Sequence, residues 1–200
     1  MDANLAALAD NLCLSGGAKG ADLQFGMCAG MIGHGVIHWS FDGHRSDAPE
    51  QEIVRLTKAQ LEEADIALAK AALRTRRNST PRSMFVRNLL RRNWYQVRDA
   101  ERVYAVATID NNGHVSGGTA WAVAMFMDRF EGEPCEIYVY DMSVSQWVTW
   151  DGHFWIVIQP PKPHGVYAGV GSRDLMDNGK EAIRALYDYK KGDHEKVLSV

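Results

Sequence analysis

Three segments of this 200-residue chain share one pattern: a short apolar run, a turn rich in glycine and small residues, and a stretch with helical spacing. These segments are "LCLSGGAKGAD", "VSGGTAWAV" and "YAGVGSRDL". Glycine lets the backbone approach a ligand closely, and the helix start that follows offers unpaired N–H groups with a partial positive charge. In a parallel sheet such turns gather at the carboxyl ends of the strands, where ligand crevices form. The pattern therefore predicts an α/β domain with one shared anion-binding crevice.

Apolar runs of strand length alternate with helical patterns along the rest of the chain as well. "RVYAVATI", for example, is a continuous apolar run of the kind that a parallel sheet buries on both faces. The alternation predicts a Rossmann-like three-layer α/β domain with a mostly parallel sheet, as a single unit over residues 1–200. Strands are expected at residues 12–15, 35–41, 102–109, 135–142 and 165–171. Helices are expected at residues 3–11, 48–73 (in two pieces), 84–100 and 178–191, and directly after each of the three turns.

One segment breaks the alternation. "QWVTWDGHFWIVI", residues 146–158, has two aromatic, β-rich arms joined at Asp151-Gly152, which is a two-residue hairpin signal. We expect a Trp-rich hairpin appendage over about residues 144–158 at the edge of the sheet. Its arms carry more aromatic surface than a lone edge strand leaves in water, so we predict that it is buried in a homo-oligomer interface.

Composition narrows the class of protein. The formal net charge of −3 gives no electrostatic case for nucleic acid, and the three cysteines are too few for a disulfide framework. No run reaches the length of a membrane span, and the N-terminus lacks signal-peptide features, so we expect a cytoplasmic protein without membrane contact. His34 and His38 stand four apart in "GHGVIH", where glycine and β-branched residues favour loop and strand over a metal-binding helix face. We expect neither a metal nor a cofactor.

Arginines are concentrated between residues 74 and 98. This basic segment contains eight arginines and no acidic residue, so it must meet solvent, anionic ligands or acidic partners. Binding of single-stranded nucleic acid through these arginines, with Trp94 and Tyr95 as stacking platforms, is one reading, although both aromatic residues fit a core position better.

Three motifs carry a resemblance to a known family. "SGGAKGADLQF", "RRNWYQV" and "VSGGTAWAV", in this order, resemble a phage-borne branch of the SLOG superfamily. That superfamily includes the LOG phosphoribohydrolases, the DNA-processing protein DprA and nucleotide-sensing domains of bacterial defence systems. In that branch a strand of the type "AGVGSR" opens the chain directly before "SGGAxGAD". Here it stands at residues 168–173, so the resemblance implies a circular permutation with its cut in or near the first helix.

The resemblance also implies a site for a phosphate-containing, nucleotide-like small molecule. Its ligand would be of the ADP-ribose or cyclic-nucleotide type, and by analogy the protein would sequester a host immune signal for a phage. The residues implied are Gly16, Gly17, Ala18, Lys19, Gly20 and Asp22 from one turn, Gly117, Gly118 and Thr119 from the second, Gly171, Ser172 and Arg173 from the third, and Arg92, Asn93 and Gln96 from one helix. Among these, Asp22 has a structural alternative as a helix-start carboxylate, and Arg92 as part of a solvated helix face.

One departure from the family pattern bears on catalysis. LOG hydrolases carry PGGxGTxxE, whose glutamate works with an arginine to cleave a ribose–base bond. The two possible registers of "SGGTAWAVA" place Ala124 or Ala122 at the glutamate position, and Ser116 replaces the proline. The resemblance therefore implies a binding pocket without that catalytic acid. The alternative is a LOG-like hydrolase that cleaves an N-glycosidic bond with Asp22 and Arg173 as its active pair.

Overall fold

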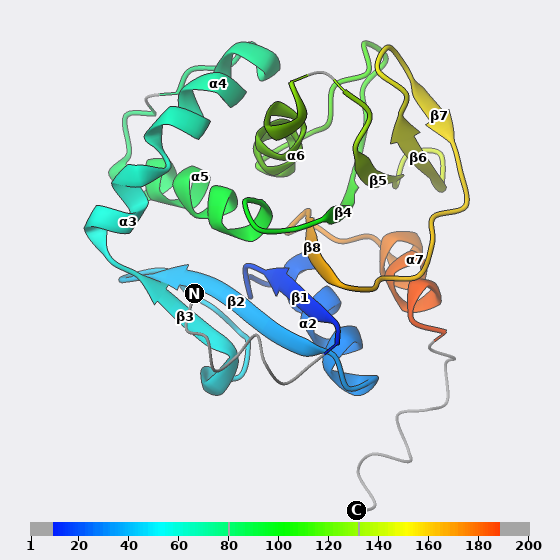
Figure 1. The fold of residues 1–200 in the computed structure, drawn as a ribbon, viewed down its shortest axis with the longest axis horizontal. Helices are drawn as coiled ribbons and strands as arrows, with labels where there is room; N and C mark the ends of the chain where they lie inside the picture. The colour runs from blue at the N-terminus through cyan, green and yellow to red at the C-terminus, as the bar shows by residue number, and fades with distance from the viewer. Residues whose placement is uncertain (1–9, 80, 132, 189–200) are drawn as a thin grey trace, which may run out of the picture.

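One sheet runs through the part of the chain that the computed structural model describes, residues 10–79, 81–131 and 133–188. Its eight strands lie in the order β3-β2-β1-β8-β4-β5-β6-β7, and all neighbours are parallel except β5–β6 and β6–β7 (Figure 1). This confirms the predicted mostly parallel α/β fold. The strands are β1 Leu12–Ser15, β2 Gly35–Phe41, β3 Ile53–Leu56, β4 Arg102–Ala107, β5 Glu136–Asp141, β6 Gln146–Trp150, β7 Trp155–Val157 and β8 Val166–Gly171.

The last strand of the chain lies in the middle of the sheet. β8 pairs with β1 on one side and with β4 on the other. If β8 came first in the chain, the strands would run outward from it on one side and then reverse to its other side, as in doubly wound sheets. This is the arrangement that a permuted chain requires.

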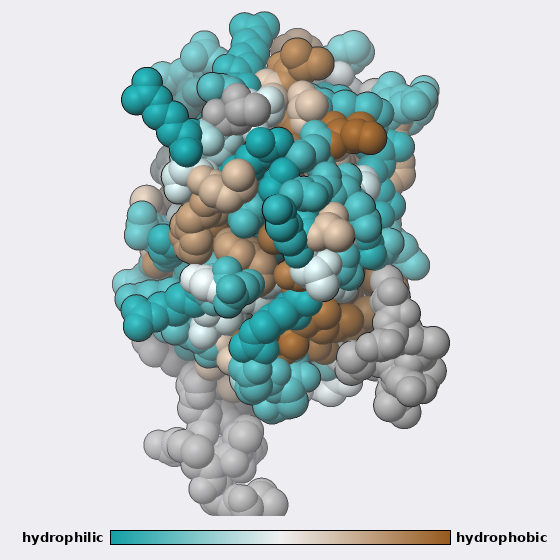
Figure 2. Space-filling view, turned by 90° about the vertical axis from the view of Figure 1, so that its left-hand side faces the viewer, coloured by the Kyte–Doolittle hydropathy of each residue, from teal (hydrophilic) through white to brown (hydrophobic). Residues whose placement is uncertain are grey.

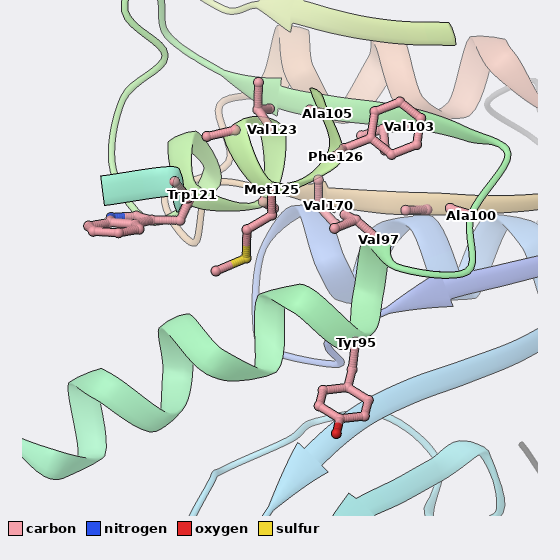
Figure 3. Close-up of a cluster of buried hydrophobic side chains, with 14 of the residues drawn as sticks. Tyr95, Val97, Ala100, Val103, Ala105, Trp121, Val123, Met125, Phe126 and Val170 are labelled. Atoms are coloured by element: carbon pink, nitrogen blue, oxygen red, sulfur yellow. The ribbon is translucent and has the colours of Figure 1, made fainter. Parts of the chain in front are cut away.

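Helices cover both faces of the sheet. Along β4, Val103 and Ala105 point into a core cluster under one helical layer, while Tyr104 and Val106 point into a second cluster under the other. Figure 3 shows Val103 and Ala105 within the first cluster. The first layer contains α3 Lys58–Glu63, α4 Asp65–Thr75, α5 Met84–Val97 and α6 Thr119–Met127, and the second contains α2 Ala21–Met31 and α7 Asp177–Leu186.

The helix expected over residues 48–73 is wrong in its first part. Residues 53–56 form β3, whose Ile53 lies opposite His38 of β2 in a parallel pairing. Ile53 and Val54 are β-branched and suit a strand, and the pairing with β2 outweighs the helical spacing of the local sequence. A short 3-10 helix, η1 Glu50–Glu52, precedes β3, and α-helix begins only after Thr57, whose side chain forms a capping box with Gln60.

The hairpin continues the sheet at its edge, but its loop differs from the expected two-residue turn. Trp150 pairs with Trp155, so the loop spans four residues, and the Asp151 carboxylate accepts the N–H groups of His153 and Phe154. Trp150 and Trp155 pack on the protein's own core. The apolar surface left exposed is therefore smaller than expected: Val144, Phe154, Ile156 and Val157.

Hydrophilic surface dominates the side from which α5 begins, where hydrophobic patches are separated from one another (Figures 1 and 2). Among the described residues, no helix is both long and apolar enough to cross a bilayer. Cys13, Cys28 and Cys135 are free thiols.

The helix expected at residues 3–11 lies outside the described residues up to residue 9, and so does the end of the last expected helix from residue 189.

Candidate anion-binding site

The three glycine turns and α5 line one cavity of about 680 Å³. It lies beyond the carboxyl ends of β1, β8 and β4, where the strand order reverses, which is where doubly wound sheets place their ligands. Residues from the end of the chain and from its beginning therefore share the site. Of the residues predicted for it, the cavity is lined by Ala18, Lys19, Asp22, Arg92, Asn93, Gln96, Gly117, Gly118, Thr119, Gly171, Ser172 and Arg173.

Gly16, Gly17 and Gly20 were also expected to line the cavity, and they do not. The loop at residues 42–49 covers Gly17, because the N–H of Asp47 and the hydroxyl of Ser46 both donate to its carbonyl. A Cβ at Gly16 would lie 2.2 Å from an Arg92 nitrogen. Gly16 and Gly17 are therefore needed for close packing at this turn.

Gly20 is where the turn after β1 meets the turn after β8. A Cβ at Gly20 would lie 2.5 Å from the carbonyl oxygens of Ser172 and Arg173, and the residue has a φ of +103°. The Ser172 carbonyl accepts the N–H of Ala21 at 3.0 Å, so the turn after β8 caps the first turn of α2. This contact holds the turn after β8 against the turn after β1.

Asp22 joins three elements from the first turn of α2. Its Oδ1 accepts the N–H of Gly171 at 3.0 Å, and its Oδ2 lies 3.2 Å from Gln96 Nε2 and 3.4 Å from Arg92 Nη2. Burial raises the pKa of the Asp22 carboxyl, and the Arg92 guanidinium opposes that rise. Both oxygens are engaged within the protein, so the carboxylate fixes β8 and α5 against α2.

Arg92 is buried rather than part of a solvated helix face. Arg92 contacts Asp22 through Nη2, and its Nη1 donates to the Gly16 carbonyl at 2.8 Å. Its Nε has no hydrogen-bond partner within the described residues. Burial lowers the pKa of the Arg92 guanidinium, and Asp22 counteracts this. Arg92 therefore presents a desolvated positive charge at the cavity wall.

The N-terminus of α6 forms the opposite wall. Gly118 is the N-cap residue and supplies no side-chain cap. Arg77 donates a hydrogen bond to the Gly117 carbonyl at 2.6 Å, and the Asn93 amide donates one to the Gly118 carbonyl at 3.1 Å. In the described part of the chain, no backbone carbonyl accepts the N–H groups of Gly117, Gly118 and Thr119. These donors are left for a ligand, at the end of the helix that favours negative charge.

Positive charge exceeds negative charge in the lining, which contains four cationic side chains and two carboxylates. They are Lys19, Arg77, Arg92 and Arg173, against Asp22 and Asp174. The rest of the basic segment is partly neutralised elsewhere, since Arg87 and Arg91 bind Asp65 and Arg74 binds Asp128.

The two aromatic residues considered as stacking platforms belong to the core. Tyr95 is buried and its hydroxyl donates to the Gln60 carbonyl, while Trp94 packs against the cluster shown in part in Figure 3. Neither ring lines the cavity. The stacking contacts on which the nucleic-acid reading depends are therefore missing from this site.

Sequence reasoning missed an apolar part of the lining. Val86, Leu89 and Leu90 precede Asn93 and Gln96 on α5 at spacings of three and four, so the same helix-face argument that selected Gln96 could have found them. The remaining missed residues are Arg77, Asn78, Pro81, Ser116, Trp121, Ala122, Val170 and Asp174. Loop positions such as Pro81 carry no periodic signal.

The helix expected at residues 178–191 begins close to its predicted start, so a short loop separates it from the turn at Arg173. α7 starts at Asp177, and none of its residues lines the cavity. Its start is turned toward the turn after β5, where Asn178 donates to the Met142 carbonyl. The third turn thus contributes a loop rather than a helix N-terminus to the site.

The two candidate glutamate positions differ in location. Ala122 lines the cavity, whereas Ala124 lines a separate cavity of about 720 Å³ between α6 and the hairpin. Neither position supplies a carboxylate. His34 and His38 lie in a loop and in β2, as their sequence favours, and no three His, Cys, Asp or Glu side chains of the described residues gather as a metal site.

Comparison of the chain with protein-family models, with curated proteins and with solved structures gave no match. The resemblance to the SLOG superfamily therefore rests on the sequence motifs.

Proposed function

We propose that this protein binds a phosphate-containing, nucleotide-like small molecule, of the ADP-ribose or cyclic-nucleotide type, in the cavity beside α5. The observation that carries the proposal is the convergence of Lys19, Arg173 and the free N–H groups at the start of α6 on one cavity. Arginine and backbone N–H groups at a helix start are the donors that proteins use for phosphate. The excess of positive charge in the lining suits an anionic ligand.

Capture without turnover is the form of the function that these residues support best. The position equivalent to a LOG glutamate is an alanine in either register, and both oxygens of Asp22 are engaged within the protein. A sequestering protein needs enclosed binding and no cleavage. By analogy with the phage-borne branch, the proposed role is to withhold a host immune signal in the host cytoplasm.

A hydrolase is the second candidate, because one observation favours it. Asp22 lines the cavity and burial raises the pKa of its carboxyl, which is how enzymes keep a carboxylic acid available as a proton donor. Arg173 would then stabilise the phosphate of a nucleoside phosphate or ADP-ribose compound.

One experiment separates the two candidates. The purified protein is incubated with ADP-ribose or a cyclic nucleotide, freed of unbound ligand and heated, and the released molecule is identified by mass spectrometry. Intact ligand supports capture. Ribose 5-phosphate or free base, formed at catalytic rates by the wild type and not by Asp22→Asn, supports the hydrolase instead.

We also propose that the chain forms a homo-oligomer through the edge strand β7. Its outer edge has no neighbouring strand within the described residues, and Phe154, Ile156 and Val157 are exposed beside it. Open edges with apolar side chains are the surfaces that folded proteins normally cover.

A further inference from the structure

The face of α5 that lines the cavity changes character along its length. Val86, Leu89 and Leu90 come first, and Asn93 and Gln96 follow on the same face. At 1.5 Å per residue, the helix advances about 10 Å from Leu89 to Gln96. One helix therefore offers the cavity an apolar surface and a polar surface side by side.

The polar end of this face adjoins the phosphate-binding groups of the proposed function. Gln96 contacts Asp22, and Asn93 contacts the carbonyl of Gly118 at the start of α6. Asp22 in turn holds the N–H of Gly171, two residues before Arg173. An anionic group bound here lies at the carboxyl ends of the strands.

The apolar end is an open wall of the same cavity. Val86 is 41% exposed, and Pro81 and Trp121 belong to the same lining. Leu89 is half-buried and packs partly on the core. An apolar group placed against this wall would gain about 25 cal/mol for each Å² removed from water. Phosphate alone cannot make use of that surface.

We infer that the cavity takes a two-part ligand, with its phosphate at the three turns and a nucleobase or similar flat, weakly polar group against Val86, Leu89 and Pro81. This inference rests on the proposed function and goes beyond it, because it names the groups that distinguish a nucleotide from other phosphorylated molecules. Backbone N–H groups bind phosphate but do not distinguish one base from another. The apolar end of α5 supplies the missing recognition.

The test compares phosphorylated ligands with a base and without one. Adenosine monophosphate and ribose 5-phosphate share the phosphorylated sugar, and ADP-ribose serves as a second adenine-bearing probe. Affinities are measured by calorimetry for the wild type, for Leu89→Ala and for Leu73→Ala, a control at a leucine that is 82% exposed on α4 outside the lining.

In the wild type, at least one adenine-bearing probe should bind at least about tenfold more tightly than ribose 5-phosphate. Leu89→Ala should weaken that probe about tenfold and leave ribose 5-phosphate unchanged, while Leu73→Ala changes neither. Val86→Ala, at a more exposed position, should act in the same direction and keeps the test decisive if Leu89→Ala fails to fold.

Three outcomes count against the inference. Equal binding of ribose 5-phosphate and the adenine-bearing probes overturns it and leaves the proposed function standing. A Leu89→Ala or Val86→Ala effect of the same size on every ligand overturns it too, because the side chain would then act through the fold. If none of the three ligands binds, the proposed function itself is overturned.

Discussion

At the scale of single residues, Asp22 organises the site. It accepts hydrogen bonds from β8 and α5 while belonging to α2, and it balances the buried charge of Arg92. A carboxylate in this position explains how two ends of the chain stay in register around one cavity. Its role is that of an anchor, and under the proposed function Lys19, Arg173 and the α6 N–H groups would bind the ligand.

Replacement of Asp22 by Asn should therefore destabilise the protein. The amide would leave the Arg92 charge unpaired in a buried site and could point a donor at Gln96, and breaking a buried ion pair costs about 3–5 kcal/mol. Urea unfolding measures the change in the free energy of unfolding. Asp42→Asn, at an exposed loop position, is the control, and a loss no larger than that of the control would contradict the anchoring role.

His38 predicts a pH dependence of stability. Burial lowers its pKa to about 4, with the Arg92 charge acting in the same direction, although Glu52 lies 3.6 Å from its Nε2. Above pH 6.5 the ring is neutral in both the folded and unfolded states. As the pH falls from 6.5 toward 4, His38 is protonated in the unfolded chain but stays neutral in the folded protein. The free energy of unfolding therefore falls by up to about 3 kcal/mol.

Unfolding free energies measured at several pH values between 4 and 7 test this. His38→Gln should flatten the dependence, whereas His153→Gln, in the exposed hairpin loop, should retain the wild-type slope. An unchanged slope in His38→Gln would mean that the histidine is protonated in the folded protein.

At the scale of elements, the contact between the turn after β1 and the turn after β8 builds the cavity. Gly20→Ala should open it, since the new Cβ would clash with two carbonyl oxygens as well as strain a positive φ. Gly43→Ala is a matched control, because Gly43 has a φ of +80° and nothing within 4 Å of an added Cβ.

Thermal and urea unfolding should show that Gly20→Ala loses about 1–3 kcal/mol more than Gly43→Ala. Equal losses would show that the clash relaxes without cost. In that case the two turns would not depend on each other for position.

The sequence predicted those elements whose signal is local. β2 matches its apolar run at residues 35–41, and the place of Arg92 and Gln96 in the cavity follows from helical spacing. β3 was missed because it is a strand only through its pairing with β2, and β2 lies outside the local sequence from which helical spacing was judged. That Gly17 lies outside the cavity lining could not be predicted either, because the loop that covers it makes a long-range contact.

At the scale of the whole molecule, the central position of β8 brings a glycine-rich turn from near the end of the chain to the cavity. In the sheet that turn is central, whatever its place in the sequence. The same sheet ends in β7, whose edge we propose to be covered by another copy of the protein.

Light scattering at micromolar concentration tests that oligomer. The wild type should have a mass above that of one chain, and Val157→Lys should reduce it, because a lysine on an edge strand opposes pairing. Ile66→Lys, on exposed α4, should leave the mass unchanged. A wild-type mass of one chain would rule out the interface.

The central claim is that turns from both ends and the middle of the chain form one anion site, and the affinity for ADP-ribose tests it most directly. Calorimetric titration compares the wild type with Arg173→Ala and with Arg45→Ala, an exposed arginine outside the lining. Loss of the guanidinium should weaken binding at least about tenfold in Arg173→Ala and leave Arg45→Ala unchanged. Binding that survives Arg173→Ala undiminished would contradict the claim.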